Sequence, residues 1–430
     1  MSTPAATRSH VGPIVIVGAL FFIFGFVTWL NGPLITYVKL AFDLDDINAF
    51  LVPMAFYLSY FFLALPSSWI LKRTGMKGGM ALGLFVMAIG ALAFGQFATM
   101  RIYPGALAGL FVIGAGLSLL QTAVNPYVSI LGPIEGAAQR IAIMGICNKL
   151  AGIAAPLILG AVVLNGIGEF ADHVTQAQGA AREALLVDFA GKVRMPYTVM
   201  AVVLALLAVW ILRSSLPEIR ASEVNASPNT MARDKGIFGF PHLWLGVLCL
   251  FLYVGVEVMA GDAIGTYGRG FNLPLDETKL FTAYTLGAML VGYIVGFVLI
   301  PKFISQERYL AISAVLGIVF SIGALLTKGY VSVGFVAALG FANAMMWPAI
   351  FPLAIRGLGR FTETGSAFLI MGIAGGAIVP QIFAHLKDHY DFQIVFCALM
   401  VPSYIYIFYY GLSGSAAGVQ ARSVAIAQAP

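Results

Sequence analysis

Long apolar runs dominate the chain, and the charged residues gather in the segments between them. A helix needs about 20 apolar residues to cross the hydrocarbon core of a bilayer. Runs of about that length or more predict twelve transmembrane helices, at residues 12–38, 47–71, 79–99, 104–132, 138–164, 195–213, 242–268, 279–300, 308–327, 331–355, 364–386 and 392–413. The runs lack the period-two alternation of transmembrane β-strands. We therefore predict an all-α membrane protein.

The chain divides near its middle. Residues 214–241 form the longest charged segment there, and their Pro, Ser and Asn content is typical of a linker. We expect an N-terminal six-helix half at residues 1–213, a cytoplasmic linker at 214–241 and a C-terminal six-helix half at 242–430.

Short sequence matches predict that the two halves are pseudo-symmetric. The sequence Ile-Met-Gly-Ile occurs at 143–146 and again at 370–373, a shift of 227 residues. A shift of 230 pairs Gly25 with Gly255, Thr36 with Thr266, Tyr37 with Tyr267, and Lys39 with Arg269. In transporters built from parallel repeats, the substrate site lies at the midplane between the halves.

Composition and charge exclude a soluble protein and suggest an orientation. Only 10% of the 430 residues are charged and 60% are hydrophobic, whereas a soluble domain carries roughly 25% charged residues. Lys and Arg exceed acidic residues in the segments that lie inside when both termini are cytoplasmic, most strongly at Lys72, Arg73 and Lys77. The positive-inside rule therefore favours cytoplasmic termini. The basic residues lie at segment ends rather than in one patch, so we expect no nucleic-acid partner.

Three ionisable residues fall deep inside predicted spans: Lys149, Glu257 and Asp262. Placing a charged side chain at the bilayer centre costs at least ~2.5–3.5 kcal/mol, so each of these residues is expected to have a partner or a function there. If all three are ionised, Lys149 neutralises one carboxylate and the other must be protonated, hydrogen-bonded or paired with a cation. A static brace between Lys149 and one carboxylate is the alternative, and it leaves the second carboxylate unexplained.

Glu257 and Asp262 lie five positions apart, about 140° around an ideal helix, so they cannot face one cavity from a straight helix. Gly255, Gly261 and Gly265 would permit a helix break, a recognised device at transporter binding sites. Asp262 lies nearer the outer end of its span, and an interfacial position is the alternative.

Amides and aromatic residues within the spans predict a sugar-binding cavity. Gln121 and Asn125 lie on one helix face. An amide both donates and accepts hydrogen bonds, as sugar hydroxyls require, and Tyr and Trp present flat apolar faces to a sugar ring. The candidates for binding are Asn31, Gln121, Asn125, Asn148 and Glu257, with Trp347 and Tyr57 as ring platforms. Singly, each amide is also compatible with a hydrogen bond between packed helices.

The sequence contains few signs of enzymatic activity. The sequence contains no GxxxxGK[ST] phosphate loop and no HExxH metal motif. Cys147, Cys249 and Cys397 form no pairing or metal-binding pattern. We therefore expect a protein that is not an enzyme and that holds no organic cofactor.

Four segments carry a family resemblance that covers nearly the whole chain. They are the run from Leu120 to Val128 (LQTAVNPYV) continued by Leu131-Gly132-Pro133, then Trp29-Leu30-Asn31-Gly32, then the run from Tyr253 to Val258 (YVGVEV), and Met371-Gly372-Ile373 with Gly375-Gly376. They resemble the fucose/glucose/galactose symporter branch of the major facilitator superfamily. This resemblance implies a twelve-helix fold, alternating access and monosaccharide uptake across a bacterial-type inner (plasma) membrane.

The chain departs from the fucose symporters of that branch at the positions of two carboxylates. Gly32 stands where they have Asp, and Gln121 stands where they have Glu. Asn148 is retained, but Lys149 follows it where a small residue is expected. The superfamily also has a motif in the loop between the second and third spans, and here Lys72 stands at the position of its Asp. These differences argue against L-fucose. Glu257 is more typical of the glucose/galactose transporters, and an N-acetylated hexosamine would also suit an amide-rich cavity.

We therefore predict a monomeric symporter in the lipid bilayer that imports a monosaccharide with H⁺ or Na⁺. The candidates for ion coupling are Asp262, Glu257 and Lys149. If the coupling ion is Na⁺, we expect its site near Asp262. The shift of 230 places Asp262 opposite Gly32. We infer that the coupling carboxylate, which the fucose symporters carry in the first half at the position of Gly32, is supplied here by the symmetry-related position 262 of the second half. The alternatives are a facilitative uniporter, in which Lys149 permanently replaces the cation, and a membrane sensor that binds sugar without moving it.

Overall fold

The computed structural model describes residues 11–130, 137–214, 216, 236–300 and 302–418, and their regular elements are all helical. The N-terminal half contains α1 (Val11–Trp29), α2 (Asn31–Ala41), α3 (Asp46–Ala49), α4 (Leu51–Thr99), α5 (Tyr103–Ile130), α6 (Ala137–Val162), α7 (Ile167–Gln176), α8 (Gly179–Gly191) and α9 (Arg194–Arg213). The predicted all-α class is confirmed. Most of the predicted linker, and Leu131-Gly132-Pro133, lie outside the described residues.

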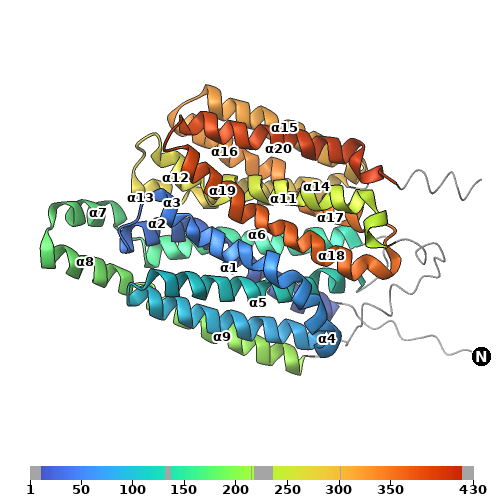
Figure 1. Ribbon diagram of the computed structural model, residues 1–430, viewed down its shortest axis with the longest axis horizontal. Helices are drawn as coiled ribbons and strands as arrows, with labels where there is room; N and C mark the ends of the chain where they lie inside the picture. The colour runs from blue at the N-terminus through green and yellow to red at the C-terminus, as the bar shows by residue number, and fades with distance from the viewer. Residues whose placement is uncertain (1–10, 131–136, 215, 217–235, 301, 419–430) are drawn as a thin grey trace, which may run out of the picture.

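The C-terminal half repeats the pattern of long helices along one common direction (Figure 1). It contains η3 (Ile237–Gly239), α11 (Pro241–Gly261), α12 (Ile264–Arg269), α13 (Leu275–Thr278), α14 (Phe281–Leu299), α15 (Gln306–Leu326), α16 (Gly329–Asn343), α17 (Met346–Ile355), η4 (Gly359–Phe361), α18 (Thr362–Met371), η5 (Gly372–Ala374), α19 (Gly375–Leu386), α20 (Phe392–Leu412) and η6 (Gly414–Ala416).

Within the described residues, eleven helical segments are long and apolar enough to cross a membrane. One of them, Asp46–Thr99, has 54 residues, more than twice the ~20 that a crossing needs. Gly75 interrupts it with φ 73° and ψ 172°, a conformation that only glycine adopts readily. This segment therefore supplies two crossings, which brings the number to the twelve predicted.

Several predicted spans are interrupted helices. The first breaks at Leu30 between α1 and α2, and the seventh breaks at Asp262 and Ala263 between α11 and α12. The tenth breaks between α16 and α17. Pro33 and Pro348 lie in the first turn of the segment that follows a break, where proline's missing N–H leaves no helical hydrogen bond unmade.

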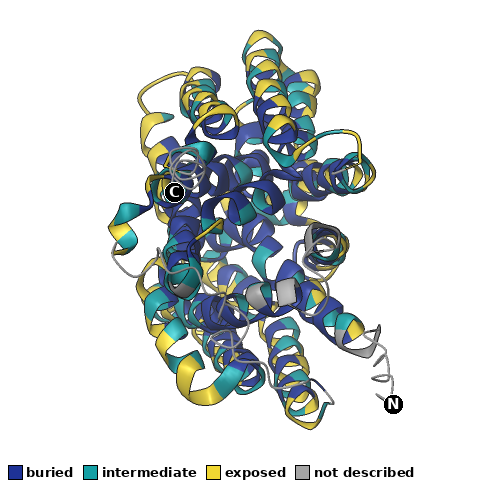
Figure 2. Ribbon diagram, turned by 90° about the vertical axis from the view of Figure 1, so that its right-hand side faces the viewer, coloured by how far each residue is buried: buried dark blue, intermediate teal, exposed yellow. Residues whose placement is uncertain are grey.

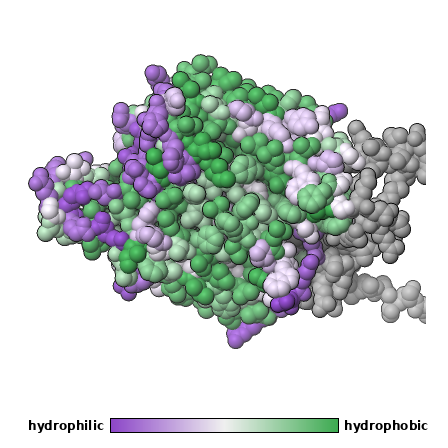
Figure 3. Space-filling view, viewed as in Figure 1, coloured by the Kyte–Doolittle hydropathy of each residue, from purple (hydrophilic) through white to green (hydrophobic). Residues whose placement is uncertain are grey.

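The two ends of the bundle differ. Helices α7 and α8 form a hairpin that projects from one end, which we call the hairpin end (left in Figure 1). These two helices occupy the segment between the predicted spans 138–164 and 195–213, where no helix was predicted. Helix α1 begins and α20 ends at the opposite end, which we call the terminal end. On the face shown in Figure 3, hydrophilic residues gather at the hairpin end, and the surface over the middle of the bundle is mostly hydrophobic.

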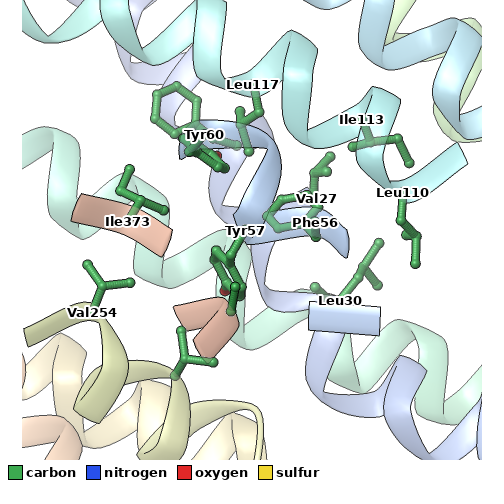
Figure 4. Close-up of a cluster of buried hydrophobic side chains, with 14 of the residues drawn as sticks. Val27, Leu30, Phe56, Tyr57, Tyr60, Leu110, Ile113, Leu117, Val254 and Ile373 are labelled. Carbon is green, nitrogen blue, oxygen red and sulfur yellow. The ribbon is translucent and has the colours of Figure 1, made fainter. Parts of the chain in front are cut away.

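Buried residues fill the centre of the bundle, where the two halves meet (Figure 2). Part of this core runs from the N-terminal half into the C-terminal half (Figure 4). Its members there are Val27, Leu30, Phe56, Tyr57, Tyr60, Leu110, Ile113, Leu117, Val254 and Ile373.

Two glycines that the sequence analysis paired, Gly25 and Gly255, both lie where helices approach closely. A Cβ atom on Gly25 in α1 would stand 2.1 Å from the backbone oxygen of Asn148 in α6. A Cβ on Gly255 in α11 would stand 2.5 Å from Cγ2 of Val379 in α19. Small residues at such contacts let helix backbones pack in lipid. Equivalent helix pairs in the two halves therefore use equivalent glycines.

We predict that Gly25→Ala lowers the melting temperature of the purified protein, because the added methyl group must displace the α6 backbone. Overpacking of this kind costs about 1–3 kcal/mol. Gly287→Ala in α14 is the matched control, since nothing lies within 4 Å of its Cβ position. Equal melting temperatures for the two variants would show that α1 and α6 do not depend on this close contact.

Candidate functional site

A cavity of about 110 Å³ lies between the two halves near the middle of the bundle. From the N-terminal half it is lined by Phe21, Phe24, Thr28, Trp29, Tyr57, Tyr60, Gln121, Asn125, Ile141, Gly145, Asn148 and Lys149. From the C-terminal half it is lined by Tyr253, Val254, Glu257, Val258, Tyr293, Trp347, Pro348 and Ile373. On α1, α6 and α11 the lining residues stop at Trp29, Lys149 and Val258, so the cavity extends from mid-depth toward the terminal end.

Most of the predicted binding residues line this cavity. Gln121, Asn125, Asn148, Glu257, Tyr57 and Trp347 do so, together with Lys149. Asn31 does not, because it lies past Trp29, where the lining on α1 ends, on the side of the hairpin end. Its side chain is buried at 1% exposure, and its Nδ2 has no hydrogen-bond partner among the described residues.

Lys149 crosses the interface between the halves. Its Nζ lies 3.1 Å from Oε1 of Glu257, and the two side chains are 6% and 13% exposed. The ammonium also lies 4.4 Å from the ring centroid of Trp29 and 6.0 Å from that of Tyr293. An aromatic face stabilises a desolvated cation through its quadrupole. One carboxylate and two rings therefore hold this charge at membrane depth.

Asp262 is the second buried carboxylate, and it lies at the break between α11 and α12. It is 2% exposed, so its carboxylate is enclosed by protein and reaches neither solvent nor lipid. Its Oδ2 accepts a hydrogen bond from the hydroxyl of Tyr57 at 3.2 Å. The backbone of Gly32 also lies against this carboxylate. Tyr57 also lines the cavity, and thus connects Asp262 to the cavity wall.

Gly32 and Asp262, which the shift of 230 pairs in sequence, also meet in space. A Cβ atom on Gly32 would stand 3.3 Å from Oδ1 of Asp262 and 2.5 Å from Oγ1 of Thr282. A carboxylate projecting from position 32 would therefore enter the same small region that Asp262 occupies. The geometry is consistent with one acidic group that either half can supply.

The helix break at Asp262 is stabilised from α14. The hydroxyl of Thr282 donates to the carbonyl of Gly261 at 2.8 Å, and that of Thr285 donates to the carbonyl of Ala260 at 2.8 Å. These are the carbonyls that an interrupted helix leaves without their usual partners. In a membrane such groups need a partner from the protein.

The amides of the cavity already take part in a local network. Nε1 of Trp29 donates to Oδ1 of Asn148 at 3.4 Å, and Nδ2 of Asn148 donates to the carbonyl of Phe21 at 3.4 Å. Nε2 of Gln121 donates to the hydroxyl of Tyr60 at 3.2 Å. A primary amide has two donor hydrogens and two acceptor lone pairs. These contacts fix the orientation of Gln121 and Asn148 and leave hydrogen-bonding capacity for a ligand.

Polar contacts between the halves close the hairpin end. Lys387 after α19 forms an ion pair with Asp46 of α3 at 2.6 Å, and Lys39 of α2 pairs with the same carboxylate. The remaining contacts are Gln381 Nε2 to the carbonyl of Ile47 at 3.2 Å, the Gly168 N–H to Asp276 at 3.1 Å, and Lys279 Nζ to the carbonyl of Leu164 at 2.8 Å. A ligand therefore cannot reach the cavity from this end without a separation of the halves.

Six aromatic residues of the cavity were not predicted as site residues: Phe21, Phe24, Trp29, Tyr60, Tyr253 and Tyr293. Tyr253 precedes Glu257 by one helical turn, and Trp29 belongs to one of the motifs used for the resemblance. Those positions were signals that could have identified them. Tyr293 offers no signal, because it is an aromatic residue in an apolar span and only the fold brings it against Gly145 of α6.

Comparison with known proteins points to one family. The sequence profile described as "Major Facilitator Superfamily" matches residues 17–380. The chain is 34% identical over 399 residues to a glucose/galactose transporter of Brucella abortus, covering 92% of each protein. It is 28% identical over 400 residues to the L-fucose-proton symporter of Escherichia coli, covering 89% of this chain and 88% of that one.

Solved structures share the fold. The major facilitator superfamily transporter FucP, crystallised in the outward conformation, superposes with a TM-score of 0.74 at 25% identity, covering 94% of this chain and 99% of that one. A D-xylose-proton symporter superposes with a TM-score of 0.65 at 13% identity, covering 94% of this chain and 98% of that one.

We predict that Lys149→Met strongly destabilises the protein, because it leaves Glu257 buried without its partner. Breaking a buried pair on one side costs about 3–5 kcal/mol. The double variant Lys149→Met/Glu257→Gln removes both charges and should recover most of that loss. Thermal unfolding of the purified variants, analysed as a double-mutant cycle, measures the coupling. Additive effects of the two substitutions would contradict a direct ion pair between the halves.

Proposed function

Because the chain belongs to the major facilitator superfamily as a sugar transporter, we propose that it is a symporter that imports a neutral monosaccharide together with a cation. The proposed substrates are glucose, galactose or an N-acetylated hexosamine such as N-acetylglucosamine, and the cation is H⁺ or Na⁺. Relatives named as glucose/galactose transporters support the sugar class. The coupling rests on the buried charges of this chain.

The observation that carries the proposal is the unequal number of buried charges. Lys149 lies 3.1 Å from Glu257, so this pair is neutral as a unit. Asp262 is then the remaining carboxylate; it is 2% exposed, and its side-chain hydrogen-bond donor is the neutral hydroxyl of Tyr57. An isolated ionised carboxylate is unfavourable in a low-dielectric interior, and it becomes neutral by binding a proton or another cation. A transported cation satisfies this requirement.

The cavity has the chemistry of a sugar site. A carboxylate offers about four lone-pair positions, so Glu257 can accept from Lys149 and from sugar hydroxyls together. Gln121 and Asn148 supply amide donors and acceptors, while Trp347 and Tyr57 present aromatic faces. Tyr57 donates its hydroxyl to Asp262 at 3.2 Å. A sugar in contact with the Tyr57 ring would therefore act on the residue that holds the coupling carboxylate.

The proposed transport cycle follows from which end is closed. With both termini cytoplasmic, as the distribution of Lys and Arg favours, the hairpin end faces outward and the cavity extends toward the cytoplasm. To admit sugar from outside, the halves must break the pairs at Asp46 and Asp276. The side chains of Lys387 and Asp46 are 14% and 17% exposed, so water must reach and solvate these groups as the halves separate.

A facilitative uniporter is the second candidate, and Lys149 is the observation that favours it. Its ammonium already occupies the position beside Glu257 that a coupling cation would take. In this case Asp262 stays protonated throughout the cycle. Sugar would then equilibrate across the membrane without accumulating, whereas binding without any uptake would indicate a sensor.

We predict that Glu257→Gln and Gln121→Ala weaken sugar binding. Each removes hydrogen bonds to hydroxyls, worth about 0.5–1.5 kcal/mol for a neutral group and about 1.5–3 kcal/mol for a charged one. Glu257→Gln should therefore have the larger effect and should change the preference among hexose stereoisomers. Binding of labelled glucose, galactose and N-acetylglucosamine to purified protein measures this, with Glu169→Gln on the exposed helix α7 as the control. Parental affinities for every sugar in both variants would assign these side chains to helix packing.

We predict that Asp262→Asn abolishes accumulation of sugar against its gradient but preserves exchange. The neutral amide can no longer load and release a cation, while the sugar site keeps its hydrogen-bonding groups. Uptake into proteoliposomes under an imposed pH or Na⁺ gradient measures accumulation and identifies the ion, and counterflow of labelled sugar measures exchange.

Asp188→Asn on the exposed face of α8 is the control for this experiment. Continued concentration of sugar by Asp262→Asn would contradict the assigned role of Asp262. If the parent protein only equilibrates sugar under both gradients, the uniporter is the correct function.

A further inference from the structure

A second, larger cavity lies on the lipid-facing side of the N-terminal half. It has a volume of about 550 Å³ and is formed by α1, α6 and α9. Helix α1 packs on α6, and α9 packs on α4, so a groove remains between α1 and α9. Its walls include Phe22, Phe26, Val162 and Val199, which are aliphatic or aromatic. We call this feature the α1–α9 groove.

The groove is as long as the hydrocarbon part of one membrane leaflet is thick. It runs along α1 from Phe22 to Leu30 and along α9 from Met195 to Leu204. At 1.5 Å per helical residue these stretches measure about 12–14 Å. That is close to half of a hydrocarbon core of about 30 Å. The groove therefore occupies the half of the bilayer nearest the hairpin end, and a lipid acyl chain matches its length and its apolar walls.

One charged residue marks the end of the groove where a lipid headgroup would lie. Lys192 precedes α9 at the hairpin end, and it is the charged residue among those that form the groove. Its Nζ lies 5.7 Å from the ring of Phe170 and 5.5 Å from the ring of Phe189. Both rings belong to the α7–α8 hairpin, so the hairpin holds the ammonium near the level of the headgroups. A lysine there attracts an anionic lipid.

From this arrangement we propose that the α1–α9 groove binds an anionic phospholipid such as phosphatidylglycerol. One acyl chain lies between α1 and α9, and the phosphate pairs with Lys192. Zwitterionic phospholipids offer the same acyl chain without the net charge, so the site prefers the anionic lipid. This proposal depends on the groove and Lys192 alone, and it does not require sugar transport.

The groove also has a position from which a lipid could influence the sugar cavity. Phe22 and Phe26 of α1 face the groove, whereas Phe21, Phe24 and Trp29 of the same helix line the sugar cavity. A single helix thus separates the two sites. An acyl chain in the groove would support α1 from the lipid side, against the face that carries Trp29 and its contact with Lys149.

Photo-crosslinking tests this site directly. Full-length protein is reconstituted in phosphatidylcholine with trace amounts of phosphatidylglycerol or phosphatidylcholine that carries a diazirine on one acyl chain, and labelled peptides are mapped by mass spectrometry. We expect the phosphatidylglycerol probe to label the segments 22–30 and 195–204 more strongly than it labels the exposed lipid face of α14. Unlabelled phosphatidylglycerol should compete for this labelling better than unlabelled phosphatidylcholine.

Two variants separate the charge from the groove. Lys192→Gln should lower labelling by the phosphatidylglycerol probe about fivefold, as expected for the loss of one interfacial lysine, without changing labelling by the phosphatidylcholine probe. Lys328→Gln, an exposed lysine at the same end, is its control. Val203→Trp should fill the groove and remove labelling there by both probes, whereas Val298→Trp on the exposed face of α14 should not.

Equal labelling of the groove by the two probes in the parent protein would overturn the preference for anionic lipid. Labelling spread evenly over all lipid-facing helices, or labelling of the groove that persists in Val203→Trp, would overturn the site itself. The melting temperature of each variant is measured as well. Only variants that melt near the parent protein's temperature are compared, so that a loss of labelling is not a loss of folding.

Discussion

Lys149 joins the two halves of the bundle at membrane depth, because its ammonium lies 3.1 Å from Glu257 of the opposite half and 4.4 Å from the ring of Trp29. Desolvation makes an unpaired charge at this depth very unfavourable. One lysine can neutralise only one carboxylate, and Asp262 is the second. Asp262 is therefore the carboxylate for which we propose a proton or another cation as partner. The proposed coupling depends on this constraint.

The internal symmetry explains how a carboxylate can serve this role from the C-terminal half. Helices α1 and α11 both give way to a second helical segment near mid-membrane, and Gly25 and Gly255 provide equivalent close contacts behind them. Because Gly32 and Asp262 face each other, an acidic side chain from either position reaches nearly the same place. Gly32 also leaves space for Thr282, whose hydroxyl supports the carbonyl of Gly261. A carboxylate at either position would thus fit the same geometry.

The sequence predicts the helical architecture well because spanning a bilayer imposes long apolar runs that can be read directly. It also predicts that Asp262 marks a helix break, since the flanking glycines permit one. The position of Asn31 could not be predicted, because the sequence does not show that the cavity lining on this span ends at Trp29. Tyr293 could not be predicted either, since an aromatic residue in an apolar span carries no sign of its neighbour. The helices of the α7–α8 hairpin have 10 and 13 residues, too few to cross a membrane, and hydropathy alone does not distinguish them from a loop.

The central claim is that a cation moves with the sugar because Asp262 requires one. Sugar-induced current in proteoliposomes on a solid-supported membrane tests it most directly, since this measurement detects charge displacement without any imposed ion gradient. The account predicts that a transported hexose evokes a transient of positive charge moving in the direction of the sugar, and that Asp262→Asn transports the same sugar by exchange without a current. Sugar movement in the parent protein without any charge displacement would contradict it.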